Sequence, residues 1–205
     1  MTKLKIDFDT IDEKSRMKLV KGSIIPRPIA WITSLNENGS VNLAPFSYFN
    51  VVSPTLVVVS FQRNGDKQKD TFVNIFREKE AVIHIVDESL IDAMDKSSTP
   101  LERNKSEVEL TNLTLSSSMK IKTPGIEEAL IRFEVVLEES ITLKNYQKDD
   151  EEADLVILRV IGSIVDEKVY DSKQGYVLSD VLRPIARLGG TDYASIKTIP
   201  FKRQF

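Results

Sequence analysis

The sequence predicts a mainly β protein, folded as a closed or partly closed antiparallel barrel with short helices between its strands. Three observations predict this fold. Short apolar runs recur at 29–35, 56–61 and 81–86, as expected for strands. An Asn-Gly pair at 38–39 follows the first run and is a strong hairpin signal. Apolar and polar residues alternate from 129 to 143, which is typical of an antiparallel strand. We expect about six strands, and closure would remove the exposed sheet edges.

The composition is that of one globular domain. The chain has 205 residues, of which 41% are hydrophobic and 29% charged, and its net charge is −3. There is no basic surplus for nucleic acid, and no apolar run approaches the length of a membrane span. The N-terminus lacks the apolar core of a signal peptide, so a cytoplasmic location is the default expectation. We expect a single domain over 1–205, with an N-terminal helix at about 11–21 and a barrel at about 22–193.

Reactive side chains are scarce. The chain has no cysteine and a single histidine, His84. Disulfides, thiolate nucleophiles and cysteine-ligated metals are therefore excluded, and a histidine-rich metal site is impossible. We predict no catalytic side chain and no metal site, and expect any chemistry to come from a bound organic cofactor. His84 lies between two isoleucines in a predicted strand, which is more typical of a structural residue than of a base.

The first fifty residues are expected to form a helix, a hairpin and a loop. Thr10 and Glu13 have capping-box spacing, which predicts a helix from Ile11 to Lys21 that Gly22 ends. Pro26-Arg-Pro28 then favours extended chain.

The first strand is expected to turn at 36–39 and return over 40–44. We expect Pro45 to end the regular pairing, and 46–50 to be an irregular loop at the sheet edge. The run at 56–61 is apolar except for Ser60, which predicts a strand buried on both faces.

The middle of the chain alternates loops with short helices. A polar loop at 62–69 is expected to precede a helix capped by Asp70 or Thr71. A second short helix is expected around 90–94. The polar segment 96–106 is expected to be exposed or mobile.

The last third is expected to form a long hairpin. The alternation over 129–143 predicts a half-solvated strand, followed by a charged turn at 145–153 and a return strand at 155–165. Gly162 is expected to mark a bulge or a barrel corner. A helical turn is expected at 177–182.

Two segments could bind a cofactor. A phosphate could bind where the polar loop meets the next helix, near Lys67, Lys69 and Thr71, because a helix N-terminus offers free N–H groups. The alternative is an ordinary capped helix. The opening hairpin could hold a flat redox-active ring between polar groups and aromatic rings; the alternative there is turn chemistry with core aromatics. These polar and aromatic residues are Thr33, Ser34, Asn42, Ser47, Asn50, Trp31, Phe46, Tyr48 and Phe49.

An ordered set of motifs resembles a known family. The segments are Pro26-Arg-Pro-Ile-Ala-Trp31-Ile-Thr-Ser34, Asn42-Leu-Ala-Pro-Phe-Ser47-Tyr-Phe-Asn50, Lys69-Asp-Thr71, and the tail Arg183-Pro-Ile-Ala-Arg-Leu-Gly-Gly190. Together they resemble the flavin reductase-like, FMN-binding split-barrel family, in its flavoredoxin branch. The resemblance implies a six-stranded antiparallel split barrel that forms a homodimer, with FMN bound noncovalently near the subunit interface.

The resemblance also implies a function. It is that of an oxidoreductase passing hydride or electrons through FMN; the alternative is a flavin-binding or electron-carrier protein without turnover. The tail has no histidine where many NAD(P)H-dependent members carry one, so the electron partner could be a small molecule or a protein. The implied cofactor-binding residues are Thr33, Ser34, Asn42, Ala44, Pro45, Phe46, Ser47, Asn50, Lys67, Lys69, Thr71, His84, Arg187 and Gly189.

Overall fold

A computed structural model describes residues 1–201 and 204. Its main sheet has seven strands in the order β3-β2-β6-β9-β10-β5-β4, and every neighbouring pair is antiparallel. The mainly β prediction is confirmed, with one strand more than expected. The strands are β2 (Ala30–Leu35), β3 (Val41–Phe46), β4 (Phe49–Ser53), β5 (Leu56–Gln62), β6 (Glu80–Ile85), β9 (Ile131–Lys144) and β10 (Glu151–Val165).

The sheet curls round on itself. Strands β3 and β4 are its two edges, yet only Ser47 and Tyr48 join them. A two-residue link can span the two edges only if the sheet is rolled up. Inside the roll, the Phe46 ring packs edge-on against the Phe61 ring, with 4.6 Å between centroids. The predicted antiparallel barrel is therefore present, split between its first and last strands.

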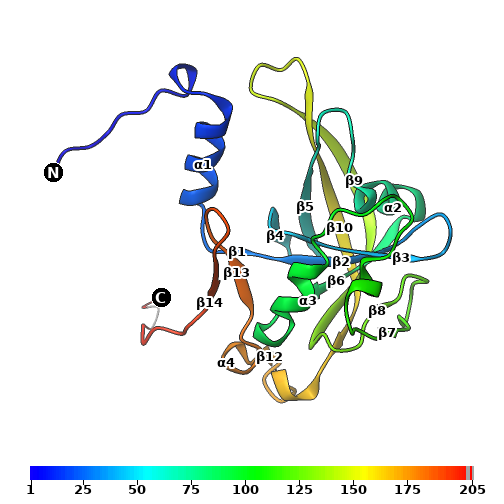
Figure 1. Cartoon of the computed structure of the whole chain (residues 1–205). Coiled ribbons are helices and arrows are strands. Elements are labelled where there is room, and N and C mark those ends of the chain that lie inside the picture. The colour runs from blue at the N-terminus through cyan, green and yellow to red at the C-terminus, as the bar shows by residue number, and fades with distance from the viewer. Residues whose placement is uncertain (202–203, 205) are drawn as a thin grey trace.

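The remaining elements surround the barrel. Figure 1 shows α1 and the N-terminus standing apart from it, next to the small sheet β1-β13-β14. No helix in the described part of the chain is both long and apolar enough to cross a membrane. The elements are α1 (Glu13–Ser23), α2 (Asp70–Glu78), α3 (Ile91–Lys96), α4 (Ser179–Leu182), β1 (Arg27–Pro28), β7 (Leu115–Ser116), β8 (Gly125–Ile126), β11 (Tyr170–Asp171), β12 (Tyr176–Val177), β13 (Ile185–Arg187), β14 (Tyr193–Ser195), and 3-10 turns at Phe8–Thr10, Glu88–Leu90, Glu107–Leu110 and Glu167–Val169.

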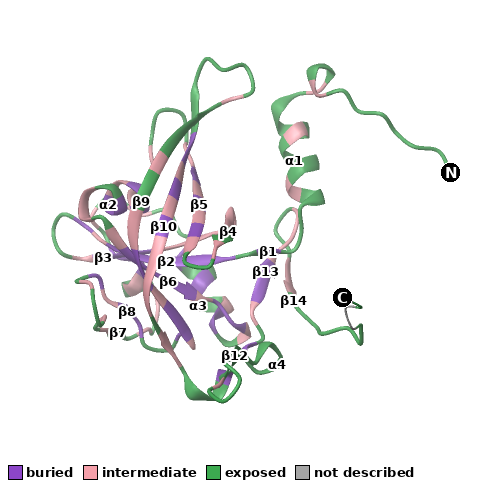
Figure 2. Ribbon diagram, turned by 180° about the vertical axis from the view of Figure 1, so that it is seen from behind, coloured by how far each residue is buried: buried purple, intermediate pink, exposed green. Residues whose placement is uncertain are grey.

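Strand β2 separates two apolar cores. Ile32 points into the barrel interior with Phe61 and Ile83, while Trp31 points to the opposite face with Met94. Figure 2 shows the buried residues concentrated where the strands cross, whereas α1 has none. Because both faces of β2 are covered, the polar side chains on this strand must find partners within the protein.

Pro45 does not end the pairing of β3, contrary to our expectation, but pairs with Trp31 inside the strand. The reason is that β3 is an edge strand of the sheet. The Leu43 N–H points away from β2 and donates to Glu107 Oε2 at 2.9 Å. Residues of an antiparallel strand alternate between paired and outward-facing N–H groups, so Pro45, two positions on, sits where no ladder N–H is needed. The loop predicted at 46–50 is correspondingly short, because β4 already begins at Phe49.

Burial of three segments differs from expectation. Strand β5 alternates between buried and half-buried residues instead of being buried on both faces. Strand β9 is not half-solvated at its start, because the Glu134 carboxylate is buried and accepts the Met119 and Lys120 N–H groups at 2.5 and 2.8 Å. The segment 96–106 is exposed only in part, because Ser97 and Ser106 are buried.

Helix ends also differ from expectation in detail. Helix α1 begins at Glu13 and is capped by Asp12, whose carboxylate accepts the Ser15 N–H at 2.7 Å; Thr10 lies in the preceding 3-10 turn. Helix α2 follows Lys69, and no side chain caps it. The predicted bulge at Gly162 is confirmed by a register shift between β9 and β10.

His84 is completely buried, and both of its ring nitrogens are used. Nδ1 lies 2.8 Å from the carbonyl oxygen of Trp31, and the Ile126 N–H donates to Nε2 at 2.9 Å. Nδ1 therefore carries the proton, and the ring is neutral. Burial lowers the pKa of His84 to about 4, because the charged form would lose its hydration.

This burial predicts acid-sensitive stability. The folded-state pKa is about 4, below the ordinary 6.5, so the unfolded chain takes up a proton first as the pH falls. We expect the free energy of unfolding to decrease by roughly 3 kcal/mol between about pH 6.5 and 4 because of His84. Urea unfolding across this range should show a steeper pH dependence for the wild type than for His84→Gln, in which carboxylate titrations are retained. Parallel curves would contradict the assignment.

Candidate functional site

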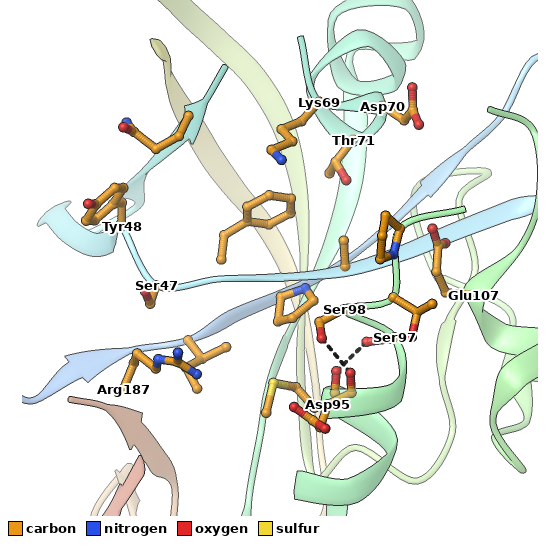
Figure 3. Close-up of a pocket in the computed structure, with 18 of the residues that line it drawn as sticks. Ser47, Tyr48, Lys69, Asp70, Thr71, Asp95, Ser97, Ser98, Glu107 and Arg187 are labelled. Carbon is orange, nitrogen blue, oxygen red and sulfur yellow. Dashed lines mark hydrogen bonds between the residues drawn. The ribbon is translucent and has the colours of Figure 1, made fainter. Parts of the chain in front are cut away.

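A cavity of about 720 Å³ lies beside strand β3. Its walls come from β3, the start of α2, the end of α3 with the loop that follows, and the β13-β14 hairpin. This volume is typical of sites for small molecules and cofactors. Figure 3 shows side chains from these four parts of the chain converging on one space.

Nine of the fourteen residues predicted to bind a cofactor line this cavity. They are Asn42, Ala44, Pro45, Phe46, Ser47, Lys67, Lys69, Thr71 and Arg187. The other five do not line it. They are Thr33, Ser34, Asn50, His84 and Gly189.

Among the five predicted residues that do not line the cavity, the buried ones form hydrogen bonds within the protein. The Thr33 hydroxyl donates to the Pro124 carbonyl at 2.7 Å. The Ser34 hydroxyl oxygen accepts from the amides of Asn42 and Asn74 at 3.3 and 3.1 Å. Ser34 therefore orients Asn42, a cavity residue, from behind. His84 lies in the second core, with both nitrogens occupied as described above.

The two remaining residues lie outside for different reasons. Asn50 is exposed on β4, and its side chain accepts the neighbouring Val51 N–H. Gly189 lies beside Gly190, which does line the cavity. A Cβ at Gly189 would lie 3.2 Å from the Gly22 Cα, so this glycine lets the tail approach the end of α1 closely.

One end of the cavity is suited to an anion. Helix α2 starts there without a side-chain cap, which leaves its first N–H groups available. The Thr71 hydroxyl oxygen accepts from the Asn42 amide at 2.8 Å, so the hydroxyl proton remains free to donate. Figure 3 shows Lys69 and Thr71 on the same side of β3. With Lys67 nearby in the lining, this end combines free N–H groups, a hydroxyl and two ammonium groups, against one carboxylate, that of Asp70.

Next to this end, the cavity wall is formed by the free edge of β3. At Pro45 this edge presents a carbonyl and no N–H, for the register reason given above. Ala44 and Phe46 flank it, and Ser47 follows at the strand end, with Ile29 supplying further apolar surface. A flat molecule placed here would meet hydrogen-bonding backbone groups at its edge and apolar side chains at its face.

Sequence reasoning missed the wall formed by 97–101. Ser97 is buried because it accepts the Trp31 indole N–H at 2.8 Å and donates to the Met94 carbonyl at 2.7 Å. These contacts bring the polar loop down onto the cavity. No local signal in the loop predicts this, because Trp31 lies 66 positions earlier in the chain.

Glu107 is a further cavity residue that was not predicted from the sequence. It lines the cavity and is buried. Burial raises the pKa of its carboxyl group, because the charged form is poorly solvated, while the bond from the Leu43 N–H acts in the opposite direction. Its contact with Leu43, together with the Ser106 hydroxyl donating to the Val41 carbonyl at 2.6 Å, holds the outer edge of β3 in place.

Comparison with known proteins gives close matches along most of the chain. Residues 22–180 match the family described as "Flavin reductase like domain". The chain is 43% identical to the protein YwrF of Bacillus subtilis (strain 168), over 92% of each chain.

Two solved structures are similar over nearly their whole length. Nitrilotriacetate monooxygenase component B from Bacillus cereus is 40% identical, covers 99% of this chain and all of its own, and has a TM-score of 0.93. Pseudomonas fluorescens 2-nitrobenzoate 2-nitroreductase NbaA is 28% identical, covers 98% of both chains, and has a TM-score of 0.85. The predicted resemblance is confirmed: the chain belongs to the flavin reductase-like family of flavin-related oxidoreductases.

Proposed function

We propose that this protein binds FMN noncovalently in the cavity beside β3 and passes hydride or electrons through it between a donor and an acceptor. One observation carries the proposal. A single cavity combines an uncapped helix N-terminus with the free edge of a strand. The first suits a phosphate, and the second suits the edge of a flat heteroaromatic ring.

The residues present fit FMN at both ends of the molecule. The α2 N-terminus, Lys67, Lys69 and the Thr71 hydroxyl would hold the phosphate, through charge-assisted hydrogen bonds of about 1.5–3 kcal/mol each. The edge of β3 from Pro45 to Ser47 would hold the ring. When bound, FMN supplies the redox chemistry, since the cavity has no thiol and no imidazole in its lining.

The chain's own part is placement and solvent exclusion. Glu107 and Ser106 fix β3 from outside, and Asn42 links the strand to Thr71 at the helix start. The strand that would hold the ring and the helix start that would hold the phosphate are thus joined by a direct hydrogen bond. The loop at 97–101 and the β13-β14 hairpin close the cavity from the other sides, which would reduce the access of water to the ring.

The names of two relatives support a redox role with different partners. One is a component of a monooxygenase and the other is a nitroreductase. We therefore propose that the electron partner is either a small molecule or another protein.

A direct test is titration of flavin-free protein with FMN, followed by assay of NADH and NADPH oxidation with and without an added acceptor. We expect quenching of FMN fluorescence that saturates at one FMN per chain. Turnover with an acceptor would identify an enzyme, whereas binding without turnover under any donor would favour the carrier alternative. Absence of FMN binding would refute the proposal.

The phosphate site gives a sharper prediction. Thr71→Val keeps the shape of a buried side chain but removes the hydroxyl. We expect the affinity for FMN to fall about tenfold or more, because a hydrogen bond to a charged group is lost. Binding of riboflavin, which has no phosphate, is the internal control and should change little, since Asn42 keeps Ser34 as a partner. An equal loss for both flavins would place the phosphate elsewhere.

We also propose that the protein is a homodimer. Helix α1 buries none of its residues, yet Met17 and Val20, three positions apart on one face, are 44% and 43% exposed, and Ile24, directly after the helix, is 63% exposed. The helix is held at its two ends. Arg16 stacks on Tyr146 of the β9-β10 turn at 4.6 Å, and Arg27 binds the carbonyls at the helix C-terminus. An apolar face held away from its own barrel suits a second copy of the chain.

Sedimentation tests this assembly. We expect the wild type to sediment as a dimer and the double variant Val20→Glu, Ile24→Glu to sediment as a monomer, because two carboxylates cannot be buried at an apolar contact. Val177→Glu, an exposed apolar position outside α1, is the control and should remain a dimer. A monomeric wild type would exclude the proposal.

A further inference from the structure

The end of the cavity near the chain's tail carries a second group of cations. Lys21, Arg27 and Arg187 line it. Among the described residues, no carboxylate lies within ion-pair distance of any of the three. Other arginines do have such partners, for example Arg63 with Asp154 at 2.6 Å. Figure 3 shows Arg187 on the opposite side of β3 from Lys69 and Thr71.

Arg27 holds this end together. Its guanidinium donates to the carbonyls of Lys21 and Ile24 at 2.6 and 3.0 Å, and to the carbonyl of Leu188 at 2.9 Å. The end of α1 and the β13-β14 hairpin therefore meet on one side chain. Arg27 is 9% exposed, and its Nε is buried without a partner. The charge of this nearly buried guanidinium is stabilised by carbonyl dipoles and not by a carboxylate, so a nearby anion would stabilise it further.

The other two cations are held at the cavity wall by aromatic rings. The Arg187 guanidinium lies over the Tyr193 ring at 4.5 Å and uses one nitrogen to donate to the Gly190 carbonyl at 2.7 Å. The Lys21 ammonium lies over the Tyr48 ring at 5.3 Å. These contacts limit the freedom of both side chains, and Arg187 retains further N–H groups for a ligand.

We propose that this end of the cavity binds the anionic group, a carboxylate or a phosphate, of the second reactant. The inference rests on the proposed function, in which FMN has one phosphate and α2 binds it. The cations at the opposite end then have no group of FMN to neutralise. Asp95 also lines the cavity on this side of β3 (Figure 3), but the three cations outnumber this carboxylate. Because the cations line one partly enclosed space, their combined potential favours an anion. Arg187 would select the reactant that exchanges electrons with FMN.

The test uses FMN-saturated protein and three probes followed by calorimetry: benzoate for a carboxylate, AMP for a phosphate, and benzyl alcohol as the uncharged counterpart of benzoate. We expect at least one anion to bind about tenfold or more tightly than benzyl alcohol, with an affinity that falls as salt is added. Preference for benzoate or for AMP identifies the class of anion.

Variants locate the site. Arg187→Met should lower the affinity for the preferred anion about tenfold or more without lowering the affinity for benzyl alcohol. Arg187→Lys, which keeps the charge, should recover part of the lost affinity. Lys173→Met removes an exposed charge outside the cavity and should change nothing. Equal affinity for benzyl alcohol and both anions, or no effect of Arg187→Met, would overturn the inference.

The two proposals fail in distinguishable ways. If FMN does not bind to the wild type, the proposed function is wrong, and the same titrations on flavin-free protein then decide the cationic site by itself. If FMN binds but neither anion does, the proposed function stands and the second-reactant site is wrong.

Discussion

The free edge of strand β3 is the constraint on which the rest of the site depends. A barrel that is split must leave one side of its edge strands unpaired, and backbone groups there need other partners. In this chain Glu107 and Ser106 satisfy the edge at Leu43 and Val41. Pro45 removes the next N–H altogether. What remains open is a short stretch of strand edge facing a cavity, and this is where a ligand can complete the hydrogen bonding of the sheet.

The same split explains why the cavity is built from distant parts of the chain. The two-residue link through Ser47 and Tyr48 turns the chain sharply where the barrel opens. Helix α2, the 97–101 loop and the β13-β14 hairpin cover the opening. Asn42 joins β3 to α2, Trp31 joins β2 to the loop, and Arg27 joins the end of α1 to the hairpin. Three side chains of the first hairpin region thus hold the walls.

Some polar side chains form hydrogen bonds that hold the fold together, and others line the cavity and can bind a ligand. The single histidine, which could have been a reactive group, is used entirely by the second core. Ser34 and Thr33 likewise form hydrogen bonds within the protein. The polar lining of the cavity consists of hydroxyls, amides, cations and the carboxyl groups of Asp70, Asp95 and Glu107, which bind and orient a ligand but supply no redox chemistry. This division agrees with the proposal that a flavin provides the reactivity.

The sequence by itself determined six of the seven strands of the main sheet, the first hairpin, the lack of thiols and the family, because alternation, turn residues and ordered motifs are local properties. It also located two parts of the cavity wall, since 42–47 and 67–71 are continuous segments. Only the tertiary structure decided that Pro45 stays paired, that His84 is internal, and that the polar loop after α3 forms a wall. Each of these depends on contacts between residues far apart in the chain, such as the one from Trp31 to Ser97, and no local pattern encodes which distant group will meet a given side chain.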